Sequence, residues 1–218
     1  MVSLVGIDEA RRGPVIGSMV ICGVLIEESQ EKLLREIGAK DSKLLSHKQR
    51  IFLSKEILKV ISKYKAIIVS SQEIDEAVNS EELNLNKLEA IKTAMIINYL
   101  KPDKVILDCP STNINSYVNY LKTFLKYEPK IKAEHKAENY PVVAAASILA
   151  KVIAEDELSK LKKQYNVDFG SGYPSDPLTQ EFLKKNYGKY DFFRKTWATY
   201  KNVVEDKKQK NLSDYSKI

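Results

Sequence analysis

Acidic residues follow two apolar stretches of the sequence at the points where each stretch ends. Asp8 and Glu9 come directly after residues 4–7, and Asp108 follows residues 105–107. In α/β sheets, ligand sites form outside the carboxyl ends of the strands. Carboxylates brought together there repel one another unless a cation lies between them, and Mg²⁺ prefers such oxygen ligands. Two such ions can promote an in-line displacement at phosphorus, in which one ion activates water and the second stabilises the leaving oxygen.

The two neighbouring acids pose a geometric problem. A regular strand pleat sends Asp8 and Glu9 to opposite faces of the sheet. Both can line one site only if the strand breaks up here, which the following turn residues 11–14 favour. A strand-end acid also has an ordinary structural interpretation as a cap or a lysine partner, and the pattern alone leaves that open.

Strands and helices alternate along most of the chain. Apolar, β-branched runs predict strands at 2–7, 15–26 (one strand or two), 64–70, 105–107 and 130–134. Helical periodicity and capping residues predict helices at 29–37, 46–62, 71–78, 85–100, 113–125 and 141–165, followed by 177–187 and 195–209. This order predicts an α/β fold with a helical C-terminal part, divided into residues 1–176 and 177–218.

The composition is that of a globular protein. The 218 residues are 44% hydrophobic and carry a net charge of +6, with 35 basic residues, of which only five are arginines. Lysine-rich basicity favours contact with a nucleic-acid backbone over sequence-specific base reading. No apolar run reaches the roughly 18–20 residues of a membrane span, and two Cys with two His exclude a disulfide scaffold and the familiar zinc sites. We expect a soluble, cytoplasmic monomer.

Seven sequence motifs follow one another along residues 6–197. They are GIDEARRGPVIG at 6–17, DSKL at 41–44, LD at 107–108, HKA at 135–137, AASILAKV at 145–152, GSGYPSDP at 170–177 and RKTW at 194–197. One such match is weak evidence, but seven in order are specific. Together they resemble ribonuclease HII, the type 2 ribonuclease H family, and the wording at 170–177 is similar to its archaeal branch.

The resemblance implies an RNase H-like mixed β-sheet flanked by helices. It also implies an endonuclease, dependent on Mg²⁺ or Mn²⁺, that cuts the RNA strand of RNA–DNA hybrids. Such enzymes also cut 5′ of a ribonucleotide in duplex DNA and leave 3′-hydroxyl and 5′-phosphate ends. The family's four metal-binding catalytic acids correspond to Asp8, Glu9, Asp108 and Glu138. The family has aspartate at the fourth position, so the extra methylene of Glu138 puts the placement of a metal ion in question.

The resemblance also assigns substrate contacts. The RNA–DNA junction would be read by Arg12, Gly13 and Tyr173, with Tyr173 packed on the deoxyribose that follows the ribonucleotide. Ser147 and Lys151 would contact the sugar–phosphate backbone or support the site, and Lys43 and Arg194 would contact phosphates. For each lysine the alternative is a solvated surface charge.

Arg11 is a second departure from the family pattern, which has glycine at this position. In the family the turn approaches the 2′-hydroxyl through its backbone. Glycine permits such an approach and a positive φ, whereas arginine carries a Cβ and a long side chain. We therefore expect weakened or altered junction recognition, and the alternative is an added phosphate contact.

The C-terminal tail contains a degenerate motif. Gln209, Leu212 and Tyr215 have the spacing of a sliding-clamp (PCNA) interaction motif, but Ser216 stands where a second aromatic residue is usual. The alternative for this segment is a frayed, solvated end. A second functional hypothesis follows: a hybrid-binding protein, impaired in cleavage by Arg11 and Glu138, that is recruited to the clamp.

Overall fold

The computed structural model describes residues 1–39 and 45–215, and a five-stranded sheet lies at its centre, with strand order β3-β2-β1-β4-β5. The strands are β1 (Ser3–Ala10), β2 (Met19–Glu27), β3 (Lys63–Val69), β4 (Lys104–Asp108) and β5 (Lys130–Glu134). β1 pairs antiparallel with β2 and parallel with β4, so the sheet is mixed, as expected. The parallel pairing brings the carboxyl ends of β1 and β4 to the same edge.

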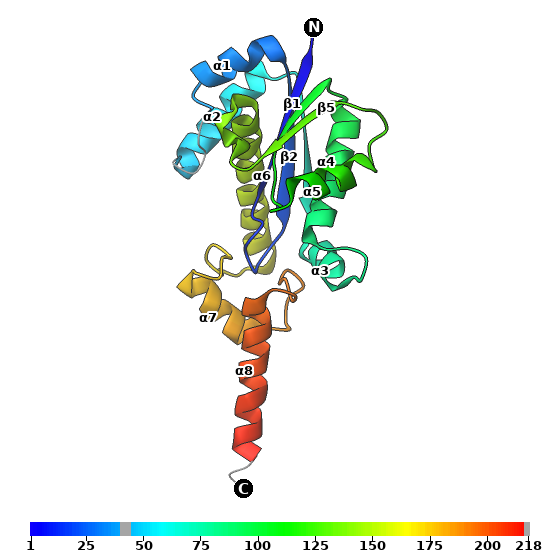
Figure 1. Ribbon diagram of the computed structural model, residues 1–218. Helices are drawn as coiled ribbons and strands as arrows, with labels where there is room; N and C mark the ends of the chain where they lie inside the picture. Colours follow the sequence, from blue (N-terminus) through cyan, green and yellow to red (C-terminus); the bar gives the residue numbers. More distant parts are fainter. Residues whose placement is uncertain (40–44, 216–218) are drawn as a thin grey trace.

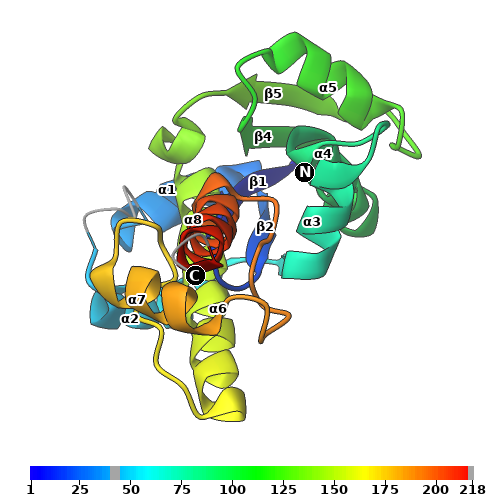
Figure 2. The ribbon, with the colours of Figure 1, turned by 90° about the horizontal axis from the view of Figure 1, so that it is seen from below.

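Helices cover both faces of the sheet (Figure 2). One face is covered by α1 (Glu31–Glu36), α2 (His47–Val60) and α6 (Pro141–Tyr165). The other is covered by α3 (Ser71–Asn79), α4 (Leu85–Leu100) and α5 (Ile114–Lys122). Short 3₁₀ helices are η1 (Glu28–Gln30) and η3 (Ala137–Asn139), and the chain ends with α7 (Pro177–Asn186) and α8 (Ala198–Tyr215). The last helix projects away from the sheet, at the opposite end of the molecule from the N-terminus (Figure 1). Among the described residues, none of the helices combines the length and the hydropathy that a membrane span requires.

Helix α6 packs directly on the central strand. A Cβ on Gly6 would lie 2.3 Å from the carbonyl carbon of Val142, so only glycine permits this approach. Pro141 occupies the first turn of α6, where its missing N–H costs nothing, and the alanines that follow are buried against the sheet. The close packing fixes the position of α6 relative to the end of β1.

Two predicted boundaries are wrong in an instructive way. The apolar run at 15–26 forms one strand that begins only at Met19. Val15 and Ile16 belong instead to a third hydrophobic cluster with Phe193 and other C-terminal residues. The last helix begins at Ala198, because Arg194 and Trp197 bond the turn after β1 and the N–H groups of residues 195 and 196 donate to Asp75 of α3. The division of the chain at residue 176 stays a prediction.

Candidate active site at the carboxyl ends of β1 and β4

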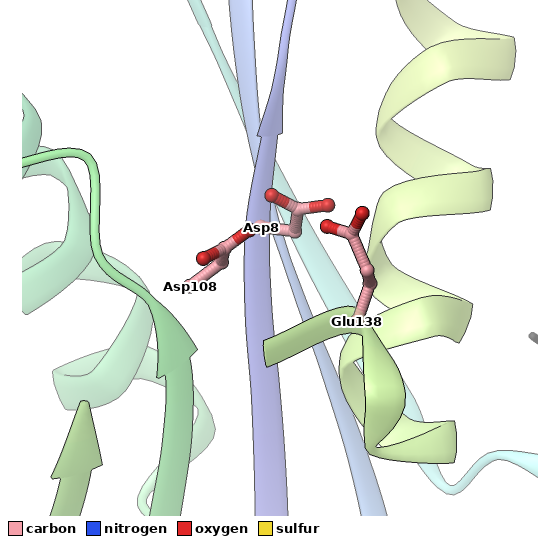
Figure 3. A group of neighbouring side chains, drawn as sticks. All are labelled: Asp8, Asp108 and Glu138. Carbon is pink, nitrogen blue, oxygen red and sulfur yellow. The ribbon is translucent and has the colours of Figure 1, made fainter. Parts of the chain in front are cut away.

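Three carboxylates converge at the sheet edge. Asp8 comes from β1, Asp108 is the last residue of β4, and Glu138 comes from η3 (Figure 3). One carboxylate oxygen from each lies within 4.8 Å of those of the other two. We call this group the carboxylate centre. The extra methylene of Glu138 does not keep its carboxylate away from the two aspartates.

Burial and like charge raise the proton affinity of these groups. Burial raises the pKa of Asp8 to about 7, and the charges of Asp108 and Glu138 act in the same direction. The pKa of Asp108 is also raised, first by burial and then by its contact with Glu138. Near neutral pH the carboxylate centre therefore needs either a shared proton or a cation to offset the repulsion.

Hydrogen-bond donors orient the two aspartates. Asp8 accepts a hydrogen bond from the Ser147 hydroxyl, and its Oδ1 accepts one from the backbone N–H of Glu9 at 2.8 Å. The backbone N–H of Ala137 donates to Asp108 Oδ1 at 3.4 Å. Ser147 is only 1% exposed and bonds Asp8, so the structure places it as a support of the site, which is one of its two predicted roles.

The donor set fits a divalent metal ion. Carboxylate oxygens are the ligands that Mg²⁺ and Mn²⁺ prefer. A cation among the three groups would remove the repulsion that raises the pKa values of Asp8 and Asp108. Asp8, Asp108 and Glu138 are therefore the residues that would hold such an ion.

Glu9 lies on the opposite face of β1 from Asp8. The strand keeps its register with β2 through Asp8, Glu9 and Ala10, so the expected break in the strand is wrong. The Glu9 carboxylate is outside the group of oxygens within 4.8 Å of one another. Burial raises its pKa well above the usual range, with the charge of Asp8 next in importance. Glu9 is thus a neighbour of the carboxylate centre rather than a member of it.

Glu89 of α4 is a buried acid that the sequence analysis missed. It is 1% exposed, and its Oε1 accepts a hydrogen bond from Arg12 Nε at 2.8 Å. Asn86, one turn earlier, accepts from Arg12 Nη2, also at 2.8 Å. The sequence carried one signal for this role: Glu89 stands between the apolar residues Leu88 and Ala90 on a predicted helix. An acid at a buried position needs a positively charged or hydrogen-bonding partner.

The structure brings two of the predicted junction residues together. A Cβ placed on Gly13 would lie 3.9 Å from Cε1 of Tyr173, and Tyr173 is 40% exposed. The backbone oxygen of Gly13 accepts a hydrogen bond from Trp197 Nε1 at 3.1 Å. The guanidinium of Arg12, the third predicted junction residue, is directed to α4 through Glu89.

Arg194 is not available to a phosphate. It is 0% exposed, and its guanidinium donates to the backbone oxygens of Arg11, Arg12 and Gly17 at 2.7, 2.7 and 2.9 Å. The prediction of a substrate contact is therefore wrong, because the side chain serves as an internal clamp. We call residues 11–17, which this clamp holds, the arginine turn.

The remaining predicted residues lie in three places. Lys43 falls outside the described residues. Lys151 is half-buried on α6, one turn after Ser147. The three residues that match the sliding-clamp (PCNA) interaction motif lie in α8, and Gln209 is exposed. They are Gln209, Leu212 and Tyr215.

Comparisons with known proteins identify the family and agree with the fold. The family model described as Ribonuclease HII matches residues 5–200. Ribonuclease HII of Pyrococcus furiosus is 44% identical over 212 residues, which cover 94% of this chain and 92% of that protein. The solved ribonuclease H2 of Pyrococcus horikoshii superposes with a TM-score of 0.84 at 41% identity, covering 94% of this chain and 98% of that one. The ribonuclease HII of Archaeoglobus fulgidus, solved in a complex with PCNA, gives a TM-score of 0.81 at 39% identity and covers 92% and 96% of the two chains. Two of the seven motifs thus supply the converging aspartates of a fold that the relatives share, and the chain belongs to the ribonuclease HII family.

Proposed function

We propose that this metal-dependent endoribonuclease cleaves the RNA strand of RNA–DNA hybrids and also cuts 5′ of single ribonucleotides in duplex DNA. The products would be 3′-hydroxyl and 5′-phosphate ends. The observation that carries the proposal is the convergence of Asp8, Asp108 and Glu138 within 4.8 Å, with the pKa of Asp8 raised to about 7.

Two divalent ions, Mg²⁺ or Mn²⁺, would activate water and neutralise the charge that develops on the leaving oxygen. Asp8, Asp108 and Glu138 would hold the ions, with the Glu9 carboxylate as a further acid on the other face of β1. Ser147 fixes the Asp8 carboxylate by its hydrogen bond, and the Ala137 N–H fixes Asp108. These donors keep the ligands preorganised, which lowers the reorganisation needed in the transition state.

Substrate selection would use the surface beside the arginine turn. The proximity of Gly13 to the exposed Tyr173 ring supports a shared role at the RNA–DNA junction. Tyr173 would pack on the deoxyribose after the ribonucleotide, because an aromatic face suits a sugar that lacks the 2′-hydroxyl. Lys43 and Lys151 would contact phosphates, which position a duplex without reading its sequence.

Recruitment to a sliding clamp is a second part of the proposal. A relative with 39% identity has been solved as a PCNA:RNase HII complex. The motif residues Gln209, Leu212 and Tyr215 lie in α8, which projects from the sheet domain (Figure 1). Such a position would leave the active site free while the tail is bound.

The test is a cleavage assay with three labelled duplexes. One carries a single ribonucleotide, one carries an RNA tract, and one is all DNA; each is incubated with Mg²⁺, Mn²⁺ or EDTA. We expect metal-dependent cleavage 5′ of the single ribonucleotide and within the RNA tract, with no cleavage of DNA. Asp8→Asn should abolish it, whereas Asp206→Asn, a matched change at an exposed site on α8, should not.

The same assay separates the enzyme from the hybrid-binding alternative. Hybrid mobility shifts with and without metal, together with no cleavage of either ribonucleotide-containing duplex, would contradict the proposal and favour a binding protein. Cleavage of the RNA tract alone would retain the nuclease but contradict the proposed action on single ribonucleotides.

A further inference from the structure

Arg11 adopts an uncommon backbone conformation immediately after β1. Its φ angle is +62°, in the left-handed region that a residue with a Cβ rarely occupies. Such a conformation persists only where surrounding contacts enforce it. One contact comes from Arg194, which donates to the backbone oxygen of Arg11 at 2.7 Å.

The Arg11 side chain supplies contacts of its own. Its Nη1 donates to the backbone oxygen of Ser171 at 2.9 Å, and its Nη2 donates to that of Ile16 at 3.0 Å. The guanidinium carbon lies 5.6 Å from the centre of the Tyr173 ring, within range of a cation–π contact. The guanidinium is half-buried, and this burial lowers its pKa. The side chain therefore bridges the arginine turn and the loop that carries Tyr173.

The loop and the turn also meet through their backbones. The Gly172 oxygen accepts hydrogen bonds from the N–H groups of Val15 and Ile16 at 2.9 and 3.3 Å. Gly172 has a φ of +81°, and a Cβ there would lie 2.7 Å from Arg11 Nη2. The guanidinium therefore occupies the space that the glycine leaves open. Arg11 thus adds side-chain hydrogen bonds where the arginine turn and the Tyr173 loop are already joined by backbone hydrogen bonds.

We propose that Arg11 is a positioning residue that holds Tyr173 beside Gly13 and so sets the selectivity for ribonucleotides followed by DNA, which differs from the weakened recognition that its departure from the family glycine led us to expect. The proposal rests on the proposed function for its substrate. Its structural part does not, because the two hydrogen bonds and the ring contact exist without a duplex. A planar guanidinium with several donors can bond two carbonyl oxygens and lie beside a ring at once, which a lysine ammonium does less well.

The structural part is tested by hydrogen–deuterium exchange of peptides covering residues 170–177. Glycine accommodates a positive φ, so Arg11→Gly should fold while losing the bridge. We expect exchange in this segment to be about fivefold faster in Arg11→Gly, with Arg11→Lys intermediate and the β1 peptides unchanged. Unchanged exchange in the 170–177 peptides would overturn the proposal whether or not the protein cleaves any substrate.

The selectivity part is tested by a double-mutant cycle with Arg11→Gly and Tyr173→Ala. The readout is kcat/KM for the single-ribonucleotide duplex divided by kcat/KM for the RNA-tract duplex. We expect Arg11→Gly to lower this ratio about fivefold through KM, and to have almost no further effect when Tyr173 is already alanine. Equal effects in both backgrounds, or an unchanged ratio in Arg11→Gly, would overturn the assignment. Failure of the unmodified chain to cleave either duplex would instead contradict the proposed function, and exchange would still decide the bridge.

Discussion

The carboxylate centre and the arginine turn each bring like charges close together, but the protein supplies partner groups for the charges only in the arginine turn. In the carboxylate centre, Asp8 and Asp108 receive few donors, and burial with mutual repulsion raises their pKa values. In the arginine turn, the guanidinium of Arg11 donates to protein carbonyl oxygens and Arg12 pairs with Glu89, while Arg194 donates to the backbone of the turn. The guanidinium groups at the turn therefore have hydrogen-bond partners within the protein. The carboxylate centre needs a proton or a cation to offset its repulsion, which is the expected difference between a reactive site and a rigid support.

The largest expected effect is on catalysis at Asp8. Asp8→Asn keeps the size of the side chain but removes the charge that would hold a metal ion. We expect kcat/KM for RNA-tract cleavage to fall on the order of 1,000-fold or more. Asp206→Asn is the matched control, since Asp206 is exposed on α8. A loss below tenfold in Asp8→Asn would place the reaction elsewhere.

The largest expected effect on stability is at Arg194. Arg194→Met would leave the backbone oxygens of Arg11, Arg12 and Gly17 without their buried donor. We expect the free energy of unfolding in urea to fall by about 3 kcal/mol. Arg35→Met, at an exposed position on α1, should change it by less than about 0.5 kcal/mol. Equal effects of the two substitutions would contradict an internal clamp.

The metal-free protein should lose stability as pH rises. Asp8 has a pKa of about 7 in the folded protein against an ordinary 3.8, so the folded state binds the proton more tightly. The stabilisation is present below pH 3.8 and is lost as pH rises through about 7. Asp8→Asn has no such proton, so in EDTA at pH 8 it should be more stable than the unmodified protein by roughly 1–3 kcal/mol.

Thermal or urea unfolding at several pH values measures this difference. The stability gap between the two proteins should widen from pH 5 to pH 8 in EDTA. Addition of Mn²⁺ should reduce it, because the ion stabilises the protein that retains Asp8 more than it stabilises Asp8→Asn. A stability difference that does not depend on pH would contradict the raised pKa of Asp8 at the carboxylate centre.

A smaller effect is expected at Glu138. In this chain the backbone of η3 positions the longer side chain so that its carboxylate meets Asp8 and Asp108. Glu138→Asp would withdraw the carboxylate by one methylene, although it matches the family pattern. We expect an approximately tenfold higher Mn²⁺ concentration for half-maximal cleavage. An unchanged metal requirement would show that Glu138 does not contribute a ligand.

The smallest effect is expected at Glu89. Glu89→Gln removes the charge that pairs with Arg12 but keeps an oxygen for its Nε. Because the Arg12 side chain is 37% exposed, water can compensate in part. We expect roughly a threefold loss in kcat/KM for the single-ribonucleotide duplex, with Glu205→Gln on α8 as the control. A loss above 100-fold would make Glu89 part of the catalytic group.

Local patterns in the sequence were enough to predict the strands that bring Asp8 and Asp108 together, because strand-end acids on parallel strands meet at one edge. The motif resemblance added Glu138, which no local pattern distinguishes from a surface acid. The roles of Glu89 and Arg194 were not predictable in this way. Their partners lie 77 and 177 or more residues away in the chain, so only tertiary packing defines them.

Two further errors share a physical cause. The expected break of β1 at Glu9 is absent because pairing with β2 continues to Ala10. The start of β2 was predicted too early, because an apolar run indicates that residues are buried but not which segment they pack against. Val15 and Ile16 pack against the C-terminal residues and not in the sheet. In both cases contacts with distant segments decide where the strand begins or ends.

Isothermal titration of the metal-free protein with Mn²⁺, in two buffers of different ionisation enthalpy, tests most directly whether the carboxylate centre is a metal site. With the pKa of Asp8 near 7, binding at pH 7 should release roughly half a proton or more, and binding should tighten as pH rises from 5 to 8. Asp8→Asn should weaken Mn²⁺ binding at least about tenfold and remove most of the proton release. Binding that is equally tight in Asp8→Asn and releases no proton in the unmodified protein would contradict the account.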